Sequence, residues 1–127
     1  MNAYLLDTFA CIFALVHPHL LGTEARELVE HPDGFVFFSP VNVWEIEIKA
    51  ATGKLAAPAG DVPEALTSLG FTELLVTSRH AERAGRLPLL HRDPFDRMLV
   101  AQALEEGMVL VTPDHALSQY ELPTLAC

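Results

Sequence analysis

The sequence predicts an α/β protein in which a central parallel sheet is covered by helices on both faces. Short apolar and β-branched runs alternate with segments of helical periodicity along the chain, and this alternation is typical of three-layer sandwiches. The 127 residues suffice for one domain with a sizeable core. Half of them are hydrophobic and only 20% are charged, which argues against a disordered chain. We therefore expect a single domain over residues 1–127, built as a three-layer α/β/α sandwich.

The first half of the chain is predicted to contain two strands and three helices. The segment FVFF at 35–38 is β-branched and aromatic and lies between Asp-Gly and Ser-Pro turn pairs, which predicts a strand. GTEAREL at 22–28 is helical, with Thr23 as its expected cap. In order, the expected elements are a strand at 2–7, helices at 8–16 and 22–28, a strand at 35–38 and a helix at 39–55.

The helix at 39–55 shows the clearest periodicity. Its apolar residues recur at spacings of three and four, which gives one apolar stripe. The stripe consists of Val41, Trp44, Ile48, Ala51 and Leu55. Glu45 and Glu47 flank Trp44 from opposite sides, so periodicity does not choose between them. Glu45 also precedes Lys49 by four residues, the favourable orientation for a helical ion pair.

The second half contains HRDPFDRMLVAQA at 91–103, which predicts the start of a helix. Asp93 is a favoured N-cap, and Pro94 suits the first helical position. Asp96 then falls at the third position, near the positive end of the helix dipole. The remaining expected elements are a helix at 61–70, a strand at 72–77, a helix at 78–85, a strand at 108–112, a helical turn at 114–120 and an edge strand at 122–126.

The net charge of −9, from 17 acidic residues against 8 Lys and Arg, argues at first against a nucleic-acid partner. Nucleic-acid binding depends mainly on neutralising phosphates. The argument fails if some carboxylates hold divalent cations, because bound ions reverse the local sign of the charge. The basic residues are also unevenly spread, with five in one short region: Arg79, Arg83, Arg86, Arg92 and Arg97.

The two cysteines, Cys11 and Cys127, imply no disulfide framework, which fits a reducing cytoplasm. The apolar stretch at the N-terminus has no basic region before it and is interrupted by Asp7, which argues against a signal peptide. No apolar run is long enough to span a bilayer. We expect a cytoplasmic protein that does not associate with a membrane.

Three aspartates are expected to meet at one edge of the sheet. Asp7 ends the first strand, Asp114 follows the strand at 108–112, and Asp96 lies in the helix before that strand. Ligands of open parallel sheets bind outside the carboxyl ends of the strands. Alone, each acid is explained as a residue that caps or starts a helix. If they converge, their charges raise one another's pKa, and Mg²⁺ or Mn²⁺ would relieve the repulsion.

Other well-known sites are not indicated by the sequence. It contains no glycine-rich phosphate-binding motif and no GxSxG nucleophile motif. It also lacks a Cys/His zinc pattern. Its histidines have no partners at ligand spacing and are assigned no role: His17, His19, His31, His80, His91 and His115.

Four segments carry the expected acids and their surroundings: LLDT at 5–8, SPVNVWEIEIKAATGKL at 39–55, LPLLHRDPFDRMLVAQA at 87–103 and LVTPD at 110–114. Together they resemble the PIN domain, and within it most closely the VapC toxins of bacterial type II toxin–antitoxin pairs. The resemblance covers most of the chain in order, and WEIxIK and HRDPFDR are its most specific parts. It implies a small α/β/α domain that gathers acidic residues around Mg²⁺ or Mn²⁺ and cleaves RNA.

The resemblance also implies which residues form the site. The acids that match the motifs are Asp7 in LLDT, Glu45 in WEI, Asp96 in DPFD and Asp114 in VTPD. Asp7 and Asp96 are then direct metal ligands, whereas Glu45 and Asp114 bind the metal directly or through water. The match selects Glu45 over Glu47 and leaves Asp93 as the helix cap. The residues expected to contact substrate are Arg92, Arg97 and Thr112.

The implied activity is metal-assisted hydrolysis of an RNA phosphodiester by a toxin of a toxin–antitoxin pair. The implied partners are a structured RNA cut in an exposed loop, a cognate antitoxin protein and a second copy of the chain in a homodimer. The sequence departs from the family at Phe9, where the related motif usually has histidine. This departure leaves the expected metal ligands intact.

Three other functions were weighed. A phosphatase of the haloacid dehalogenase type needs a second acid two positions after the first-strand aspartate, and Phe9 occupies that position. A response-regulator receiver needs adjacent acids near the first strand and a late lysine, and neither is evident. The alternative that remains is a catalytically inactive PIN-like module that binds a protein partner, in which the acids are only helix caps.

Overall fold

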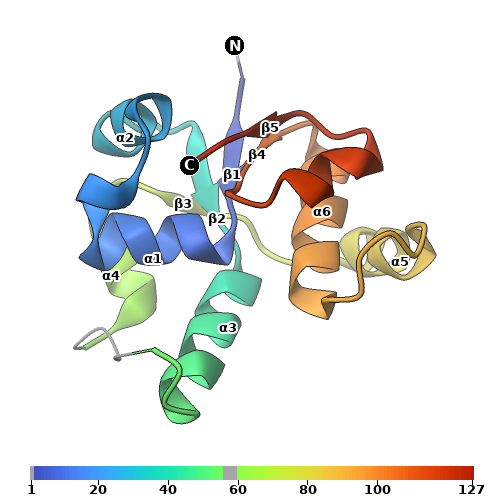
Figure 1. The fold of residues 1–127 in the computed structure, drawn as a ribbon, viewed down its shortest axis with the longest axis horizontal. Coiled ribbons are helices and arrows are strands. Elements are labelled where there is room, and N and C mark those ends of the chain that lie inside the picture. Colours follow the sequence, from blue (N-terminus) through green and yellow to red (C-terminus); the bar gives the residue numbers. More distant parts are fainter. Residues whose placement is uncertain (1, 56–59) are drawn as a thin grey trace.

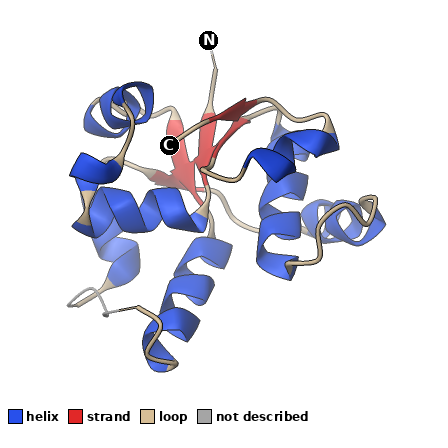
Figure 2. Cartoon of the chain, viewed as in Figure 1, coloured by secondary structure: helices blue, strands red, loops and turns tan. Residues whose placement is uncertain are grey.

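The computed structural model describes residues 2–55 and 60–127. Its centre is a five-stranded sheet in the order β3-β2-β1-β4-β5, in which every neighbouring pair is parallel (Figures 1 and 2). The strands are β1 (Tyr4–Leu6), β2 (Val36–Phe38), β3 (Thr72–Glu73), β4 (Val109–Val111) and β5 (Thr124–Leu125). The parallel sheet predicted from the sequence is confirmed.

Helices cover both faces of this sheet. They are α1 (Thr8–Val16), α2 (Thr23–Glu30), α3 (Pro40–Ala51), α4 (Val62–Ser68), α5 (Ser78–Arg86) and α6 (Pro94–Glu106), with 3₁₀ turns η1 (Pro18–Leu20) and η2 (His115–Tyr120). Leu6 and Val111 face the core formed with α1, α2 and α4. Their neighbours Leu5 and Leu110 face the core formed with α6 and η2. This alternation confirms the three-layer α/β/α sandwich.

The strand order reverses at β1 and β4, and the region outside the carboxyl ends of these two strands is called the β1–β4 crevice. From β1 the chain continues to β2 on one side, whereas β4 pairs with β1 on the other side. The two strand ends are joined where the Asp7 N–H donates a 2.9 Å hydrogen bond to the Val111 carbonyl. α3 extends from the same edge of the sheet (Figure 1). Such a reversal of strand order is where open parallel sheets bind ligands.

The strand expected at 72–77 is shorter than predicted. Only Thr72 and Glu73 pair with β2, and both are exposed at the edge of the sheet. Beyond them the Leu74 N–H still bonds to the Phe38 carbonyl, but Leu75 is 63% exposed. The apolar run that suggested a strand over 72–77 therefore continues across the surface beyond Glu73.

The apolar stripe of the helix at 39–55 is only partly buried. α3 buries Val41 and Ile46 together with the polar residues Asn42 and Glu45, whereas Trp44 is 62% exposed. The spacing of apolar residues does not show which side of a helix faces the sheet. Here the buried side includes the polar residues Asn42 and Glu45.

Two smaller features complete the fold. The cap of α2 is Gly22 rather than Thr23, and its carbonyl accepts from the Arg26 N–H. Both Cys11 and Cys127 carry free thiols, as expected. Within residues 2–55 and 60–127, no helix has the length and apolar character needed to cross a membrane.

Candidate metal centre

Asp7 lies at the carboxyl end of β1 and is 2% exposed. Its Oδ1 accepts a 2.8 Å hydrogen bond from the Ala10 N–H, so it caps α1 as aspartate commonly does. Burial raises the pKa of Asp7 to about 7. The Thr112 hydroxyl and the Ala10 N–H offset part of this increase in pKa, whereas the nearby acids Asp96 and Glu45 add to it. The ionised carboxylate is therefore costly without a cation.

The start of α3 is fixed to the start of α1 by a buried polar network. Asn42 Oδ1 accepts a 2.7 Å hydrogen bond from the Ser39 N–H, and Asn42 Nδ2 donates a 3.2 Å hydrogen bond to Thr8 Oγ1. Ser39 Oγ accepts from the Val41 N–H and completes the cap. Thr8 directly follows Asp7, so this network sets where α3 stands relative to the crevice.

Glu45 lies one turn further along α3 and is 8% exposed. Its Oε2 is 3.7 Å from Lys49 Nζ, as the sequence spacing predicted. Its Oε1 is buried and has no hydrogen-bond partner among the described residues. Burial raises the pKa of Glu45, while the Thr8 hydroxyl and Lys49 lower it. An unpartnered buried carboxylate oxygen fits a site that a cation completes.

Asp96 lies in the first turn of α6. As predicted, Asp93 is the cap of this helix, and its Oδ1 accepts from the Phe95 N–H at 2.9 Å and the Asp96 N–H at 3.3 Å. The carboxylate of Asp96 instead points to His91, with 2.8 Å between Oδ2 and Nε2. Burial raises the pKa of Asp96, and the contact with His91 lowers it.

Asp114 approaches the same imidazole from the segment after β4. Its Oδ1 caps η2 by accepting from the Ala116 N–H at 2.9 Å, and its Oδ2 lies 3.8 Å from His91 Nε2. The Asp114 N–H donates to Thr112 Oγ at 3.1 Å, which holds the buried threonine beside the crevice. One potential ligand atom from each of His91, Asp96 and Asp114 lies within 4.8 Å of the others.

The structure brings Asp96 and Asp114 together around His91, whereas Asp7 and Glu45 lie outside this group of ligand atoms and are linked to Asp96 through electrostatic repulsion. The pKa of Asp7 is raised by Asp96 and Glu45, and that of Asp96 is raised by Asp114. Like charges do not gather in this way without compensation. Several carboxylates with one imidazole make a donor set that suits a divalent cation such as Mg²⁺ or Mn²⁺. The residues present thus fit such an ion.

The two arginines expected to contact substrate occupy different environments. Arg92 is exposed and lines a pocket beside the acids. The guanidinium of Arg97 instead donates to main-chain carbonyls on α5 and the loop after it, at 2.8 Å to Ala84 and 3.0 Å to Leu87 and Pro88. Arg97 therefore holds this loop in place, and Arg92 alone of the pair stands at the candidate site.

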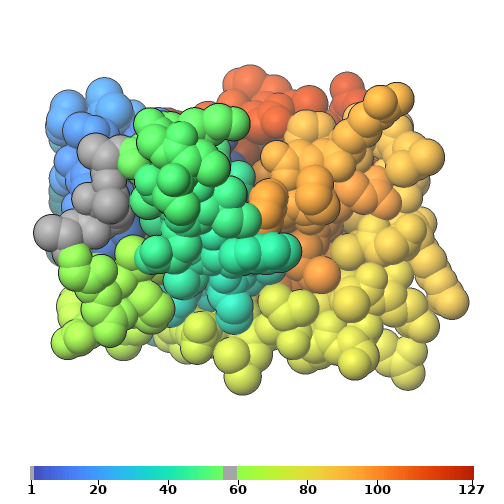
Figure 3. Space-filling model, turned by 90° about the horizontal axis from the view of Figure 1, so that it is seen from below, coloured from blue at the N-terminus to red at the C-terminus, as the bar shows by residue number. Residues whose placement is uncertain are grey.

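The pocket beside the acids has a volume of about 500 Å³. It lies between α3 and the start of α6, the two segments that meet near the centre of the face shown in Figure 3. Glu45 and Lys49 line it from α3, and Asp93 and Phe95 from the start of α6. A ligand in this pocket would therefore contact two of the helices that carry the acids.

Some residues of the site were not indicated by sequence reasoning. His91 has no partner at ligand spacing in the sequence, yet the loop before α6 folds it back onto Asp96. Ser39 with Asn42 three residues later resembles a capping box, and the structure places Asn42 in the buried network beside the site. Such a pairing in the sequence is the signal that could have identified Asn42.

Comparisons with known proteins agree with this geometry. The PIN domain family matches residues 4–122. Among solved structures, DNA-bound VapBC from Salmonella typhimurium has 19% identity and a TM-score of 0.70, covering 99% of this chain and 98% of that one. VapBC2 from Rickettsia felis, bound to a DNA fragment from its promoter, has 15% identity and a TM-score of 0.67, covering 98% of both. FitAcB from Neisseria gonorrhoeae has 14% identity and a TM-score of 0.64, covering 96% of both.

At these identities the likeness to solved structures shows a shared fold. Among curated proteins, none matches this chain in sequence. The family match includes the whole of β1 and β4 and all four acid-bearing segments. The chain therefore belongs to the PIN domain family.

Proposed function

We propose that this protein is a metal-dependent endoribonuclease that acts as the toxin of a toxin–antitoxin pair. The observation that carries the proposal is the group formed by His91, Asp96 and Asp114, whose ligand atoms lie within 4.8 Å of one another, together with the raised pKa values of Asp7, Glu45 and Asp96. Perturbed groups that cluster in this way are typical of functional sites. Nuclease chemistry is common in the family to which the chain belongs.

Asp7 and Asp96 hold the cation directly in this proposal, and Glu45 and Asp114 hold it directly or through water. A bound divalent cation supplies positive charge to the phosphate and lowers the pKa of attacking water. The chain's own contacts orient the ligands. Asp7 is held by its cap to α1, and the imidazole of His91 holds the Asp96 carboxylate at 2.8 Å. Such supporting contacts tune the affinity of a metal site.

Thr112 and Arg92 complete the proposed site from its two sides. The Thr112 hydroxyl lowers the pKa of Asp7 and accepts a hydrogen bond from the Asp114 N–H, so it acts on two of the proposed ligands. Arg92 lines the adjoining pocket and contacts the phosphate backbone of the substrate. Bidentate contacts of this kind are the usual role of arginine at phosphates.

The proposed partners are a structured RNA cut in a loop, an antitoxin protein and a second copy of the chain in a homodimer. VapBC from Salmonella typhimurium and a toxin–antitoxin complex from Klebsiella pneumoniae, both similar in fold, support the antitoxin as a partner. RNA as a substrate also places the proposed activity in the cytoplasm. The acid cluster supports a cationic cofactor, Mg²⁺ or Mn²⁺.

The test is cleavage of total cellular RNA by purified protein with Mg²⁺, Mn²⁺ or EDTA. The variants are Asp7→Asn and Asp96→Asn, which preserve side-chain shape and remove charge. A matched control is Asp61→Asn, because Asp61 caps α4 as Asp7 caps α1 but is exposed outside the crevice.

We expect discrete fragments that require metal, persist with Asp61→Asn and disappear with both site variants. The proposal fails if no condition gives cleavage and metal does not raise the melting temperature. The acids would then serve only as caps and surface charge, in a module that binds a protein partner. Cleavage that is unchanged in Asp96→Asn would show that the metal ligands are assigned wrongly.

A further inference from the structure

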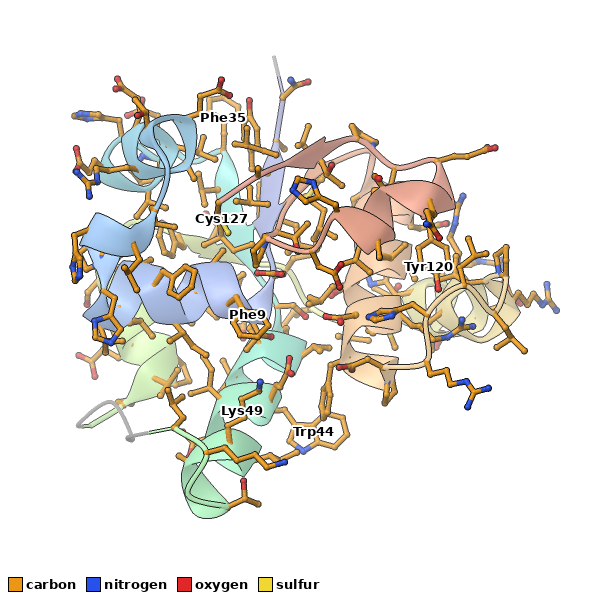
Figure 4. The ribbon with its side chains drawn as sticks, in the orientation of Figure 1. Phe9, Phe35, Trp44, Lys49, Tyr120 and Cys127 are labelled. Atoms are coloured by element: carbon orange, nitrogen blue, oxygen red, sulfur yellow. The ribbon has the colours of Figure 1, made fainter. Side chains whose placement is uncertain are left out.

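An exposed aromatic pair joins the two helices that carry Glu45 and Asp96. The ring of Trp44 packs edge-on against Phe95, with 4.9 Å between centroids and 71° between planes. Trp44 directly precedes Glu45, and Phe95 directly precedes Asp96. Figure 4 shows the indole extending from α3 toward the start of α6. The indole is nevertheless 62% exposed, which leaves much of its surface open to a ligand.

The pocket next to this pair gathers basic side chains in a protein of net charge −9. Three of the eight Lys and Arg residues, Lys49, Lys54 and Arg92, line it together with Phe95. Lys49 Nζ also lies 4.9 Å from the centre of the Phe9 ring. Of these cations Lys49 is paired with Glu45 at 3.7 Å, and Glu45 and Asp93 also line the pocket, so Lys54 and Arg92 are the cations that the pocket offers to a ligand beside Phe95.

Elsewhere the basic side chains already have partners. Arg79 and Arg86 pair with Glu82, and Arg83 pairs with Glu105. Arg97 donates to main-chain carbonyls, and Arg26 on α2 donates to the Pro18 carbonyl at 3.4 Å. The overall negative charge is therefore a poor guide to the charge that a ligand meets at this pocket.

We propose that the pocket and the Trp44–Phe95 pair hold a single-stranded segment of RNA beside the bond to be cut. An unpaired base stacks on the Trp44 indole, while Lys54 and Arg92 contact the flanking phosphates. Aromatic platforms with a basic groove are the common means of holding single strands. A duplex offers no unstacked base to such a platform. This inference rests on the proposed function and adds the residues that select the substrate.

Tryptophan fluorescence reports directly on the contact between RNA and Trp44, because Trp44 is the only tryptophan in the sequence. The experiment follows tryptophan emission of the Asp7→Asn protein with Mg²⁺, so that binding is measured without cleavage. The probes are an oligoadenylate, the same strand paired with oligouridylate, and a polyglutamate peptide. We expect the single strand to change the emission strongly, and the duplex and the peptide to have little effect.

Substitutions distinguish the contribution of base stacking to RNA binding from the contribution of the basic side chains. Binding of fluorescein-labelled oligoadenylate, read by anisotropy, should weaken about tenfold in Trp44→Ala and be preserved in Trp44→Phe, because both aromatic rings stack on a base. Lys54→Gln and Arg92→Gln should each lower the slope of log affinity against log salt by about 0.7. Arg26→Gln on α2 is the matched control and should leave the slope unchanged.

Three results would overturn the inference: emission unchanged by the single strand, equal binding of the duplex, or tighter binding of the acidic peptide. The last would assign the pocket to an acidic protein segment. These results are distinct from failure of the nuclease itself. If Trp44→Ala cleaves RNA in the presence of metal with a normal KM, the protein is a nuclease but Trp44 does not hold the substrate. If RNA binds as expected but no condition gives cleavage, Trp44 holds RNA but the protein is not a nuclease.

Discussion

Charged side chains are arranged in opposite ways on the outer surface of α5 and α6 and at the β1–β4 crevice. On the outer surface of α5 and α6, opposite charges are paired, as in the 2.7 Å contact between Arg83 and Glu105. At the β1–β4 crevice, like charges are brought together, and burial raises the pKa of Asp7 and Asp96. Paired surface charges are compatible with stability but contribute little to it. Crowded buried carboxylates oppose folding, so their presence indicates that they serve binding rather than stability.

The first prediction, with the largest expected effect, concerns Asp96→Asn. Removing this proposed metal ligand should reduce RNA cleavage by more than about 100-fold, since even supporting contacts cost 10- to 100-fold. Glu105→Gln on the paired surface should leave the rate almost unchanged. Single-turnover cleavage assays measure both. Equal losses in the two variants would remove the functional contrast between the regions.

The second prediction is that Asp7→Asn stabilises the metal-free protein at high pH. The pKa of Asp7 rises from 3.8 to about 7 on folding, so folding favours the protonated form. Stability is then lost as pH rises from about 4 to 7, by at most about 4 kcal/mol. Asparagine keeps the cap and removes this loss, so the variant should be more stable at pH 8 and similar to the natural protein near pH 4.

Urea unfolding with EDTA at the two pH values measures this effect, with Asp61→Asn as the control that should show no such dependence. Adding Mn²⁺ should reverse the order, because a cation that binds the folded state stabilises only the protein with its ligands intact. If Asp7→Asn were less stable than the natural protein at pH 8, ionised Asp7 would not oppose folding.

The third prediction concerns His91, whose imidazole contacts Asp96 at 2.8 Å. His91→Gln should weaken Mn²⁺ binding about 10- to 100-fold, because it releases the carboxylate that the imidazole orients. Thermal shift against Mn²⁺ concentration provides the readout. His115→Gln is a suitable control, since His115 is exposed beside Asp114. If His91→Gln and His115→Gln bound Mn²⁺ with the same affinity, His91 would have no role in metal binding.

The smallest expected effect belongs to the paired surface. A double-mutant cycle on Arg83 and Glu105 should give a coupling energy of about 0.2–1 kcal/mol, because both side chains are partly exposed. Urea unfolding of the two single variants and the double variant measures it. A coupling of several kcal/mol would mean that the outer surface, too, depends strongly on its charges.

Local sequence signals predicted most of the fold and the helix starts that carry the candidate acids. Asp93 and Pro94 start α6 as expected, because capping depends on neighbours in the chain. The surroundings of Trp44 and His91 could not be predicted, for a shared reason. The environment of Trp44 on α3 is set by α6, which is distant in the sequence. The environment of His91 is set by the turn that folds it back onto Asp96. The pairing of Glu45 with Lys49 was predictable, whereas the burial of its second oxygen was not.

The capping role of the aspartates has a consequence for how this protein can change over time. Asp7 uses Oδ1 to hold α1, and Asp114 uses Oδ1 to hold η2, which leaves the other oxygen of each for the crevice. Asparagine can make the same cap with its one carbonyl oxygen. A single Asp-to-Asn substitution at either position would therefore remove a proposed metal ligand and preserve the cap and the shape of the protein. A silenced descendant would present the same surface to any partner that recognises shape, so loss of catalysis and loss of recognition can occur independently.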